Sequence, residues 1–227
     1  MNTFANMATM RVAKVKNKVL SDTMKLLSYT LVFGGLSSWF SISIGAGFSS
    51  AIVSLSAIVS LIAAIAVIWF VLPRTQNSNM GILTAFSVAG LLGYSLGPML
   101  THYLAMPNGA SLVMQALTGT GVSFFAISFY VQNTKKDFSF LNGMIFFAMV
   151  GIIVLPLVNV FFIESSFVSL AISFATVLTM GAFMLSQMSA IINGGETNYI
   201  SATVGLYLAL HNMFTSLLHI LGAFGDD

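Results

Sequence analysis

The chain has 227 residues, of which 57% are hydrophobic and only 6% are charged. A soluble domain carries roughly a quarter charged residues, and a soluble fold with so few charges would expose one continuous apolar surface. The composition therefore excludes an ordinary soluble domain and predicts a protein whose outer surface faces the lipid bilayer. The chain contains no cysteine, which excludes disulfides, zinc–thiolate sites and cysteine nucleophiles.

The formal net charge of +2 comes from an uneven distribution of basic residues. Five of the eight basic residues lie in the first 25 positions, namely Arg11, Lys14, Lys16, Lys18 and Lys25. Because aromatic residues do not alternate with them, we interpret them as a signal for membrane topology and not as a nucleic-acid-binding patch.

Seven stretches are long enough to cross a bilayer, which takes roughly 20 apolar residues. They are residues 26–46, 51–72, 80–104, 110–132, 139–162, 166–192 and 199–224. Polar segments rich in Pro, Gly and Asn separate them, as is typical of loops. The sequence predicts an all-α, seven-helix transmembrane domain over residues 26–224. A basic tail (1–25) precedes this domain and a short segment (225–227) follows it.

The first apolar stretch could instead belong to a cleaved signal peptide. Its basic leader is about 25 residues long and its apolar run exceeds the usual 7–15 residues. We therefore expect the first helix to be retained.

The positive charges predict the orientation of the chain in the membrane. With the N-terminus in the cytoplasm, all eight basic residues fall in cytoplasmic segments. The periplasmic segments then hold only the acidic residues Glu164, Asp226 and Asp227. The positive-inside rule thus favours a cytoplasmic N-terminus and a periplasmic C-terminus, which requires an odd number of helices.

Proline interrupts two of the expected helices, at Pro98 in the third and Pro156 in the fifth. Broken helices in corresponding positions can mark a transport pathway. Proline is also common in membrane helices that have no such role, so both interpretations stay open.

The sequence lacks two motifs of membrane enzymes, since it has no H-E-x-x-H motif and no pair of intramembrane aspartates. Residues 93–97 match G-x-S-x-G, but they lie within an expected transmembrane helix and not at the strand-to-helix turn that a serine nucleophile elbow needs. None of His102, His211 and His219 has a carboxylate within one helical turn. We therefore predict a protein that is not an enzyme and has no cofactor or metal site. Charged residues fall only in tails, loops or helix ends, which disfavours a carrier with a buried carboxylate but leaves a passive pore possible.

Polar side chains recur every four residues along the seventh stretch, at Tyr207, His211, Thr215 and His219, with Asn212 and Ser216 beside them. This spacing predicts a polar stripe along one broad face, turned away from lipid. Gln187 in the sixth stretch is a candidate hydrogen-bonding partner. The stripe either holds helices together or lines a water-accessible cavity or ion path in which His211 or His219 titrates.

The third stretch contains small residues four apart, at Ala89, Gly93 and Gly97. This spacing allows two helix backbones to approach closely. It predicts either tight packing within the chain or, as the alternative, homodimerisation.

Three separated segments carry a resemblance to a known family. The first contains Gly93, Tyr94, Gly97 and Pro98; the second runs over residues 136–144; the third contains Gly194, Gly195, Glu196, Thr197, Asn198 and Tyr199, followed by Leu206 and Tyr207. In this order they resemble the Bax inhibitor (transmembrane BAX-inhibitor-motif) family, and most closely its YccA-like bacterial branch. The similarity covers essentially the whole chain after the basic tail.

The resemblance implies a seven-helix inner-membrane protein in which the other six helices surround the last one. Members of the YccA-like branch bind and modulate FtsH, a membrane-anchored ATP-dependent protease. Other bacterial members are pH-sensitive calcium leak channels that use two aspartates on the sixth and seventh helices. Aligned on its Gly-Gly and Leu-Tyr motifs, this chain has Gln187 and Ala209 at those positions, and neither can titrate.

The resemblance, together with the missing pair of acids, therefore implies a modulator of FtsH, and we expect it to inhibit the protease as a slow substrate. The protease would grip the basic tail, which we expect to be disordered, while the packed helices resist extraction. The alternative is a passive calcium or cation leak channel lined by His211, Asn212 and Gln187. A carrier for a small neutral solute has only the topology in its favour.

Overall fold

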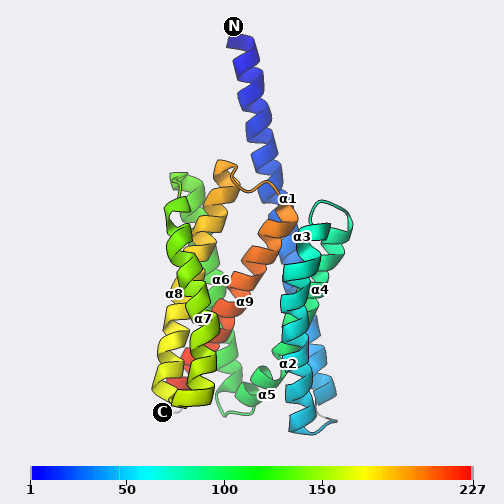
Figure 1. The fold of residues 1–227 in the computed structure, drawn as a ribbon, viewed down its shortest axis with the longest axis vertical. Coiled ribbons are helices and arrows are strands. Elements are labelled where there is room, and N and C mark those ends of the chain that lie inside the picture. The colour runs from blue at the N-terminus through cyan, green and yellow to red at the C-terminus, as the bar shows by residue number, and fades with distance from the viewer. Residues whose placement is uncertain (1, 46, 226–227) are drawn as a thin grey trace.

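The structure, a computed structural model, describes residues 2–45 and 47–225, with side chains from residue 18 onward. Within these ranges all regular structure is helical, and most helices run along one common axis (Figure 1). Seven helical spans in the described residues are long and apolar enough to cross a membrane: Lys18–Gly45, Ser50–Thr75, Met80–Leu104, Gly109–Thr134, Ser139–Ile163, Ser166–Asn193 and Tyr199–Phe224. The prediction of an all-α protein with seven transmembrane helices is confirmed.

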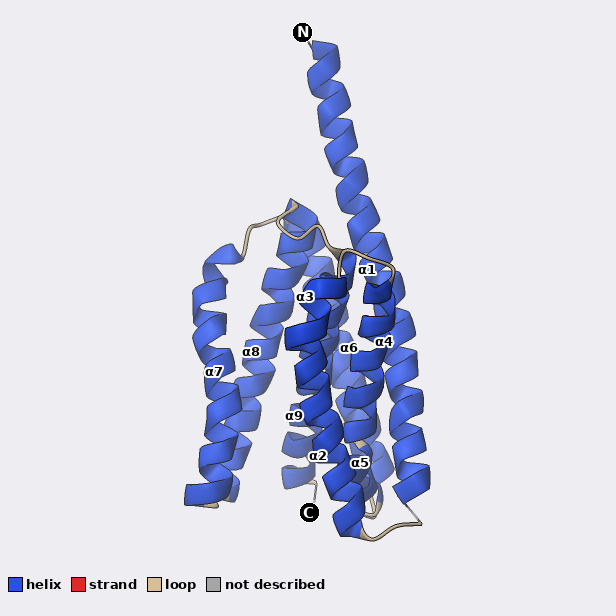
Figure 2. Cartoon of the chain, turned by 45° about the vertical axis from the view of Figure 1, so that its right-hand side comes forward, coloured by secondary structure: helices blue, strands red, loops and turns tan. Residues whose placement is uncertain are grey.

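Helix α1 (Asn2–Gly45) is longer than expected. It begins far before residue 26, and its first part projects beyond the rest of the bundle (Figures 1 and 2). The expectation of a disordered tail over residues 1–25 is therefore wrong for the described part, residues 2–25. Those residues contain no Pro or Gly and many good helix formers such as Ala, Met, Lys and Leu, so no signal ends the helix there. Asp226 and Asp227 lie outside the described residues.

The second and third spans each contain an irregularity next to a proline. Helix α2 (Ser50–Ala66) continues through the π-helical turn η1 (Val67–Val71) into α3 (Leu72–Thr75), whose second residue is Pro73. Helix α4 (Met80–Ser95) stops before Leu96, and α5 (Gly97–Leu104) restarts at another angle with Pro98 in its first turn (Figure 1). Proline lacks the N–H group that would continue the helix, so the predicted interruption at Pro98 is confirmed.

The fourth span is a single helix, whereas the fifth contains a short turn at each end. Helix α6 (Gly109–Thr134) is followed by the 3-10 turn η2 (Ser139–Leu141) and α7 (Asn142–Val158). Pro156 lies inside α7, and the π-helical turn η3 (Asn159–Ile163) follows directly. A π turn near a proline absorbs the lost backbone hydrogen bond without ending the span.

The last two spans are α8 (Ser166–Asn193) and α9 (Tyr199–Phe224). The apolar window of α9 is 56% buried, more than that of any other span. Its main contacts are with α8, α6, α1 and α4. The more specific expectation that all six other helices surround the last one stays a prediction.

Glycines bring α1 into close contact with α4 and α5. A Cβ added to Gly93 would clash with the carbonyl oxygen of Gly34, and one added to Gly97 would clash with the Ser41 hydroxyl. The Ser37 hydroxyl donates to the Gly90 carbonyl at 2.7 Å. For Gly93 and Gly97, the small-residue spacing therefore serves packing within the chain.

Candidate functional site

The polar residues of α9 do not share one face. Each step of four residues turns the helix by about 40° beyond a full turn, so twelve residues rotate the predicted stripe by roughly a third of a turn. Tyr207 and His211 consequently line one cavity, whereas Thr215 and His219 line another. The expectation of a single polar face is wrong for this reason.

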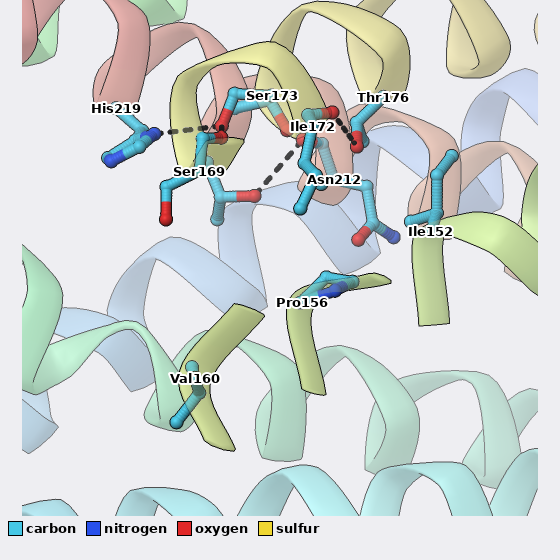
Figure 3. A pocket seen from close by; sticks show the side chains of 11 residues that line it. Ile152, Pro156, Val160, Ser169, Ile172, Ser173, Thr176, Asn212 and His219 are labelled. Carbon is cyan, nitrogen blue, oxygen red and sulfur yellow. Dashed lines mark hydrogen bonds between the residues drawn. The ribbon is translucent and has the colours of Figure 1, made fainter. Parts of the chain in front are cut away.

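The smaller cavity, of about 310 Å³, lies between α7, α8 and α9 (Figure 3). Its lining is rich in small polar side chains: Ile152, Pro156, Val160, Ser169, Ile172, Ser173, Thr176, Asn212, Thr215, Ser216 and His219. Pro156 contributes to one wall opposite Asn212, as Figure 3 shows. Its volume and lining suit water or a small polar ligand.

A hydrogen bond between His219 and Ser173 joins α9 to α8 across this cavity (Figure 3). The Ser173 hydroxyl lies 2.8 Å from His219 Nδ1 and donates to the Ser169 carbonyl at 3.1 Å. A hydroxyl has one hydrogen to donate. The arrangement that satisfies both contacts therefore has His219 donating from Nδ1–H to Ser173.

Asn159 fixes the junction of η3 and α8 beside this cavity, and the sequence analysis did not select it. Its side chain is buried and donates to the Ser165 carbonyl at 3.1 Å and to the Ser169 hydroxyl at 2.7 Å. Its Oδ1 accepts from the Ser165 backbone N–H at 3.2 Å. An Asn within an otherwise apolar run, just before a turn, was the available signal.

The polar character of this interface ends part-way along α8. Ser169, Ser173 and Thr176 line the cavity. The next residues on the same stripe are Met180 and Met184, both at most 5% exposed. The smaller cavity therefore occupies one half of the α8–α9 interface, and methionine side chains pack the other half.

The larger cavity, of about 840 Å³, is a groove between α1 and α6 with α9 as its floor. We call it the α1–α6 groove. Its lining is mostly apolar and comprises Met24, Leu27, Ser28, Leu31, Gly34, Gly35, Ser38, Leu96, Leu100, Val113, Leu117, Thr120, Gly121, Phe124, Phe125, Ser128, Gln132, Tyr207, Leu210, His211 and Phe214.

Two of the predicted polar residues lie in the floor of the groove. The Tyr207 hydroxyl donates to the Ala89 carbonyl at 3.1 Å and so ties α9 to α4. The His211 ring stacks on Tyr207 with centroids 6.4 Å apart. Within the described residues, no hydrogen-bond partner faces the His211 ring nitrogens.

The remaining candidate residues are Asn212, Thr215 and Gln187, and each has a local contact. The Asn212 side chain donates to the Leu208 carbonyl at 2.8 Å on its own helix, and Thr215 donates to the Asn212 carbonyl at 3.0 Å. Gln187 lines neither cavity; its amide packs against Gly205 of α9, where an added Cβ would lie 3.2 Å from Nε2. The structure thus does not bring His211, Asn212 and Gln187 together in one cavity.

The Gly194–Tyr199 motif ends α8 and starts α9. Gly194 adopts the left-handed conformation with φ 84°, which suits glycine, and the N–H groups of Gly195 and Glu196 bond to the Ala190 carbonyl. Glu196 accepts from the Asn198 backbone N–H at 2.7 Å. Asn198 is the N-cap of α9 and accepts from the Ile200 and Ser201 N–H groups at 3.0 Å.

Asn198 also ties this loop to the loop between α3 and α4. Its Nδ2 donates to the Gln76 carbonyl at 2.9 Å and to Asn77 Oδ1 at 2.8 Å. One side chain thus caps the most buried span and holds two loops together at the end of the bundle from which α1 projects (Figure 1).

Comparison with known proteins adds to these observations. The family model described as "Inhibitor of apoptosis-promoting Bax1" matches residues 16–226. The chain belongs to the Bax inhibitor family. It is 43% identical to an "Uncharacterized membrane protein" of Vibrio cholerae, across 93% of this chain and 92% of the relative. It is 40% identical, with the same coverage, to the "Modulator of FtsH protease YccA" of Escherichia coli K12 and to the "Inner membrane protein YccA" of Escherichia coli O6:H1.

In this Bax inhibitor family member, the other two motif segments have structural roles as well. Tyr94 lies 3.2 Å from the Ser56 hydroxyl and links α4 to α2. The Lys136 carbonyl accepts from the Ser189 hydroxyl at 2.9 Å, which fixes the α6–α7 loop on α8. The motif residues with hydrogen bonds in the structure therefore connect helices and loops.

Proposed function

We propose that this chain is an inner-membrane protein that binds and modulates an FtsH-type protease without being an enzyme itself. The observation that carries the proposal is the 40% identity to the E. coli modulator of FtsH protease across 93% of this chain. Similarity over the full transmembrane domain, and not over one motif, supports transfer of the partner.

We propose further that the end bearing the basic residues faces the cytoplasm. Helix α3, which contains Arg74, and the α6–α7 loop, which contains Lys135 and Lys136, lie at the end from which α1 projects (Figure 1). The junction of η3 and α8, which contains Glu164, lies at the opposite end, where α9 ends. The positive-inside rule then places the N-terminus in the cytoplasm and the C-terminus in the periplasm.

In this proposal the projecting part of α1 is the segment that the protease engages. It is continuous with the transmembrane part of α1, which packs closely on α4 through Gly34 and Gly93. Extraction of α1 would have to separate these backbones and uncover the Tyr207–Ala89 hydrogen bond. The packing would make unfolding slow, so the chain would occupy the protease as a slow substrate.

Co-purification from native membranes tests partner binding. The tagged chain should retain the protease, whereas an unrelated seven-helix membrane protein at the same abundance should not. Absence of the protease from a preparation of folded, abundant protein would contradict the proposal.

Truncation tests how the protease engages the chain. Shortening the segment 1–25 to about ten residues should abolish degradation of the chain by the purified protease. A matched variant replaces the removed residues with a Gly/Ser-rich segment of equal length, so that it keeps the reach but not the helix. Unchanged turnover after truncation would refute engagement through this segment.

A passive cation leak is the second candidate, and the polar cavity beside His219 is the observation in its favour. Buried Met180, Met184 and Met213 close the α8–α9 interface beyond that cavity. Gln187 and Ala209 cannot titrate at the positions that the resemblance associates with two aspartates. Calcium flux into liposomes that contain the purified chain, abolished by His219→Phe, would favour this candidate over protease modulation.

A further inference from the structure

The α1–α6 groove opens toward the surrounding bilayer. Helices α1 and α6 each pack extensively on α9 but barely contact one another. Apolar side chains at its two edges are exposed: Leu31 by 42% on α1, and Leu117 by 51% and Phe125 by 73% on α6. In a membrane-spanning protein, an apolar groove of this kind borders lipid along its length.

The length of the groove suits a lipid acyl chain. Along α1 its lining runs over residues 24–38, which corresponds to about 21 Å of helix. That length exceeds one leaflet of a hydrocarbon core of about 30 Å, so a whole acyl chain can lie along the groove. An acyl chain also has no backbone polar groups to satisfy.

The end of the groove nearer the projecting part of α1 is positively charged. Exposed Lys135 directly follows the last residue of α6 and ends the helix in a left-handed conformation with φ 51°. It lies three residues beyond Gln132, which lines the groove, so it stands at this end of the groove. On α1, exposed Lys25 lies three residues before Ser28, another lining residue.

The acidic residues near this end do not cancel that charge. Asp22 is half-buried and lies one turn before Lys25, on the side of α1 away from Ser28, and the two side chains form no ion pair in the described part of the chain. Asp137 accepts from the Ser139 backbone N–H at 2.9 Å in the turn after α6, where exposed Lys136 precedes it and offsets its charge. Lysines on both edges therefore favour an anionic group between them.

From the shape and the charge together, we propose that the α1–α6 groove binds an anionic phospholipid. One acyl chain lies along α9 over Leu210 and Phe214, and the phosphate lies between Lys25 and Lys135. Basic pockets between transmembrane helices bind anionic headgroups in this way. The site is independent of the protease proposal, because none of its argument uses that partner.

Two glycines make the groove testable without disturbing the bundle. A Cβ added to Gly35 or to Gly121 meets no atom within 4 Å, although both residues line the groove. Leucine at either position should therefore enter the groove without a backbone clash. Gly143 on α7 also meets nothing within 4 Å but lies outside the groove, so Gly143→Leu is the matched control.

The experiment is native mass spectrometry of the purified chain with phosphatidylglycerol or phosphatidylcholine of identical acyl chains. The unchanged chain should retain phosphatidylglycerol several-fold more than phosphatidylcholine. Gly35→Leu and Gly121→Leu should each lower phosphatidylglycerol retention several-fold at an unchanged melting temperature, whereas Gly143→Leu should not. Gly121→Val, with a smaller side chain, replaces a leucine variant that fails to fold. Unchanged retention in both groove variants would overturn the proposal.

A second set of variants tests the headgroup. The double variant Lys25→Gln/Lys135→Gln should lower phosphatidylglycerol retention to the level of phosphatidylcholine. Arg74→Gln removes a charge at the same end of the bundle but away from the groove, and should change neither. Equal retention of the two lipids by the unchanged chain would overturn the anionic part of the proposal.

The same variants distinguish a protein occupant. If Gly121→Leu abolishes co-purification of the protease but leaves phosphatidylglycerol retention unchanged, the groove holds a partner helix and the lipid proposal is wrong. Loss of lipid with retained protease supports the lipid site and leaves the proposed function intact.

Discussion

Gly34 and Gly35 are neighbours on α1 and both line the α1–α6 groove, yet their other surroundings differ. A Cβ at Gly34 would clash with the Tyr207 hydroxyl and lie 3.2 Å from the Ala89 carbonyl oxygen, whereas one at Gly35 would meet nothing within 4 Å. Gly34 thus lies where the groove meets the closed side of α1, which is in direct backbone contact with α4, whereas Gly35 faces the open groove alone. Small residues in one membrane helix can thus serve two purposes, close packing and the shape of a cavity.

The closed side combines close approach with hydrogen bonds between helices. Ser37 donates to the Gly90 carbonyl and Tyr207 donates to the Ala89 carbonyl. Without hydrophobic driving force between helices in lipid, such contacts supply the stability of the bundle. We therefore expect substitutions on the closed side to affect stability much more than substitutions in the groove.

The largest expected effect comes from Gly93→Val on the closed side. The new Cβ would lie 2.8 Å from the Gly34 Cα as well as against its carbonyl oxygen, and backbone atoms cannot turn aside as a side chain can. We expect a loss of about 3 kcal/mol or more in the free energy of unfolding, measured by titration with SDS in mixed micelles.

Gly121→Val in the groove is the matched control for Gly93→Val. It adds the same atoms to a transmembrane helix but into open space, so we expect a change within about 0.5 kcal/mol. Equal destabilisation by both variants would show that the closed side, which Gly93 faces, and the groove, which Gly121 faces, do not differ in packing.

The sequence predicted the closed side better than the groove. The spacing of Ala89, Gly93 and Gly97 is a local pattern with a known packing consequence, and α1 is the helix that packs against these residues. The groove arises because α1 and α6, far apart in sequence, both lie against α9 and barely contact one another. No local pattern near Gly35 or Gly121 carries that information.

A smaller effect is expected for Tyr207→Phe. The change removes the hydroxyl that donates to the Ala89 carbonyl but keeps the ring in its place. Interhelical hydrogen bonds in membranes contribute about 0.6 to 2 kcal/mol, so we expect a loss of about 1 kcal/mol in the same titration. Tyr29→Phe, at a tyrosine that is 64% exposed on α1, should change nothing. If the two variants have the same stability, the Tyr207–Ala89 hydrogen bond does not stabilise the closed side.

The far side of α9 provides the next comparison, between His219 and His211. His219 bonds to Ser173 on α8, whereas His211 has no such partner among the described residues. A double-mutant cycle with His219→Phe and Ser173→Ala should give a coupling energy of about 0.6 kcal/mol. His211→Phe with Ser173→Ala should give none, and coupling of similar size in both cycles would contradict the separation of the two cavities.

The division of the polar stripe between two cavities could not be read from the sequence. The residue types and the burial of α9 were predicted, because polar side chains avoid lipid. The fourfold spacing suggested one face, but its rotation over twelve residues turns His219 toward α8 while His211 stays beside α1 and α6. Which helices pack on either side of α9 depends on contacts between distant parts of the chain. Asn159 differs, because its partners Ser165 and Ser169 lie close to it in sequence.

Gly35→Ala should have the smallest effect, and its sign is informative when it is compared with that of Gly34→Ala. Alanine is the better helix former, and the new methyl group at residue 35 meets no atom of the bundle, so we expect a change within about 0.5 kcal/mol toward higher stability. Gly34→Ala makes the same chemical change one residue earlier, where the methyl group displaces Tyr207 from the Ala89 carbonyl, so it should lower stability. Opposite signs at adjacent positions would locate the boundary between the closed side and the groove on α1 itself. Losses of equal size would instead mean that both glycines are needed for the conformation of α1, a requirement that contacts with α4 and α9 do not explain.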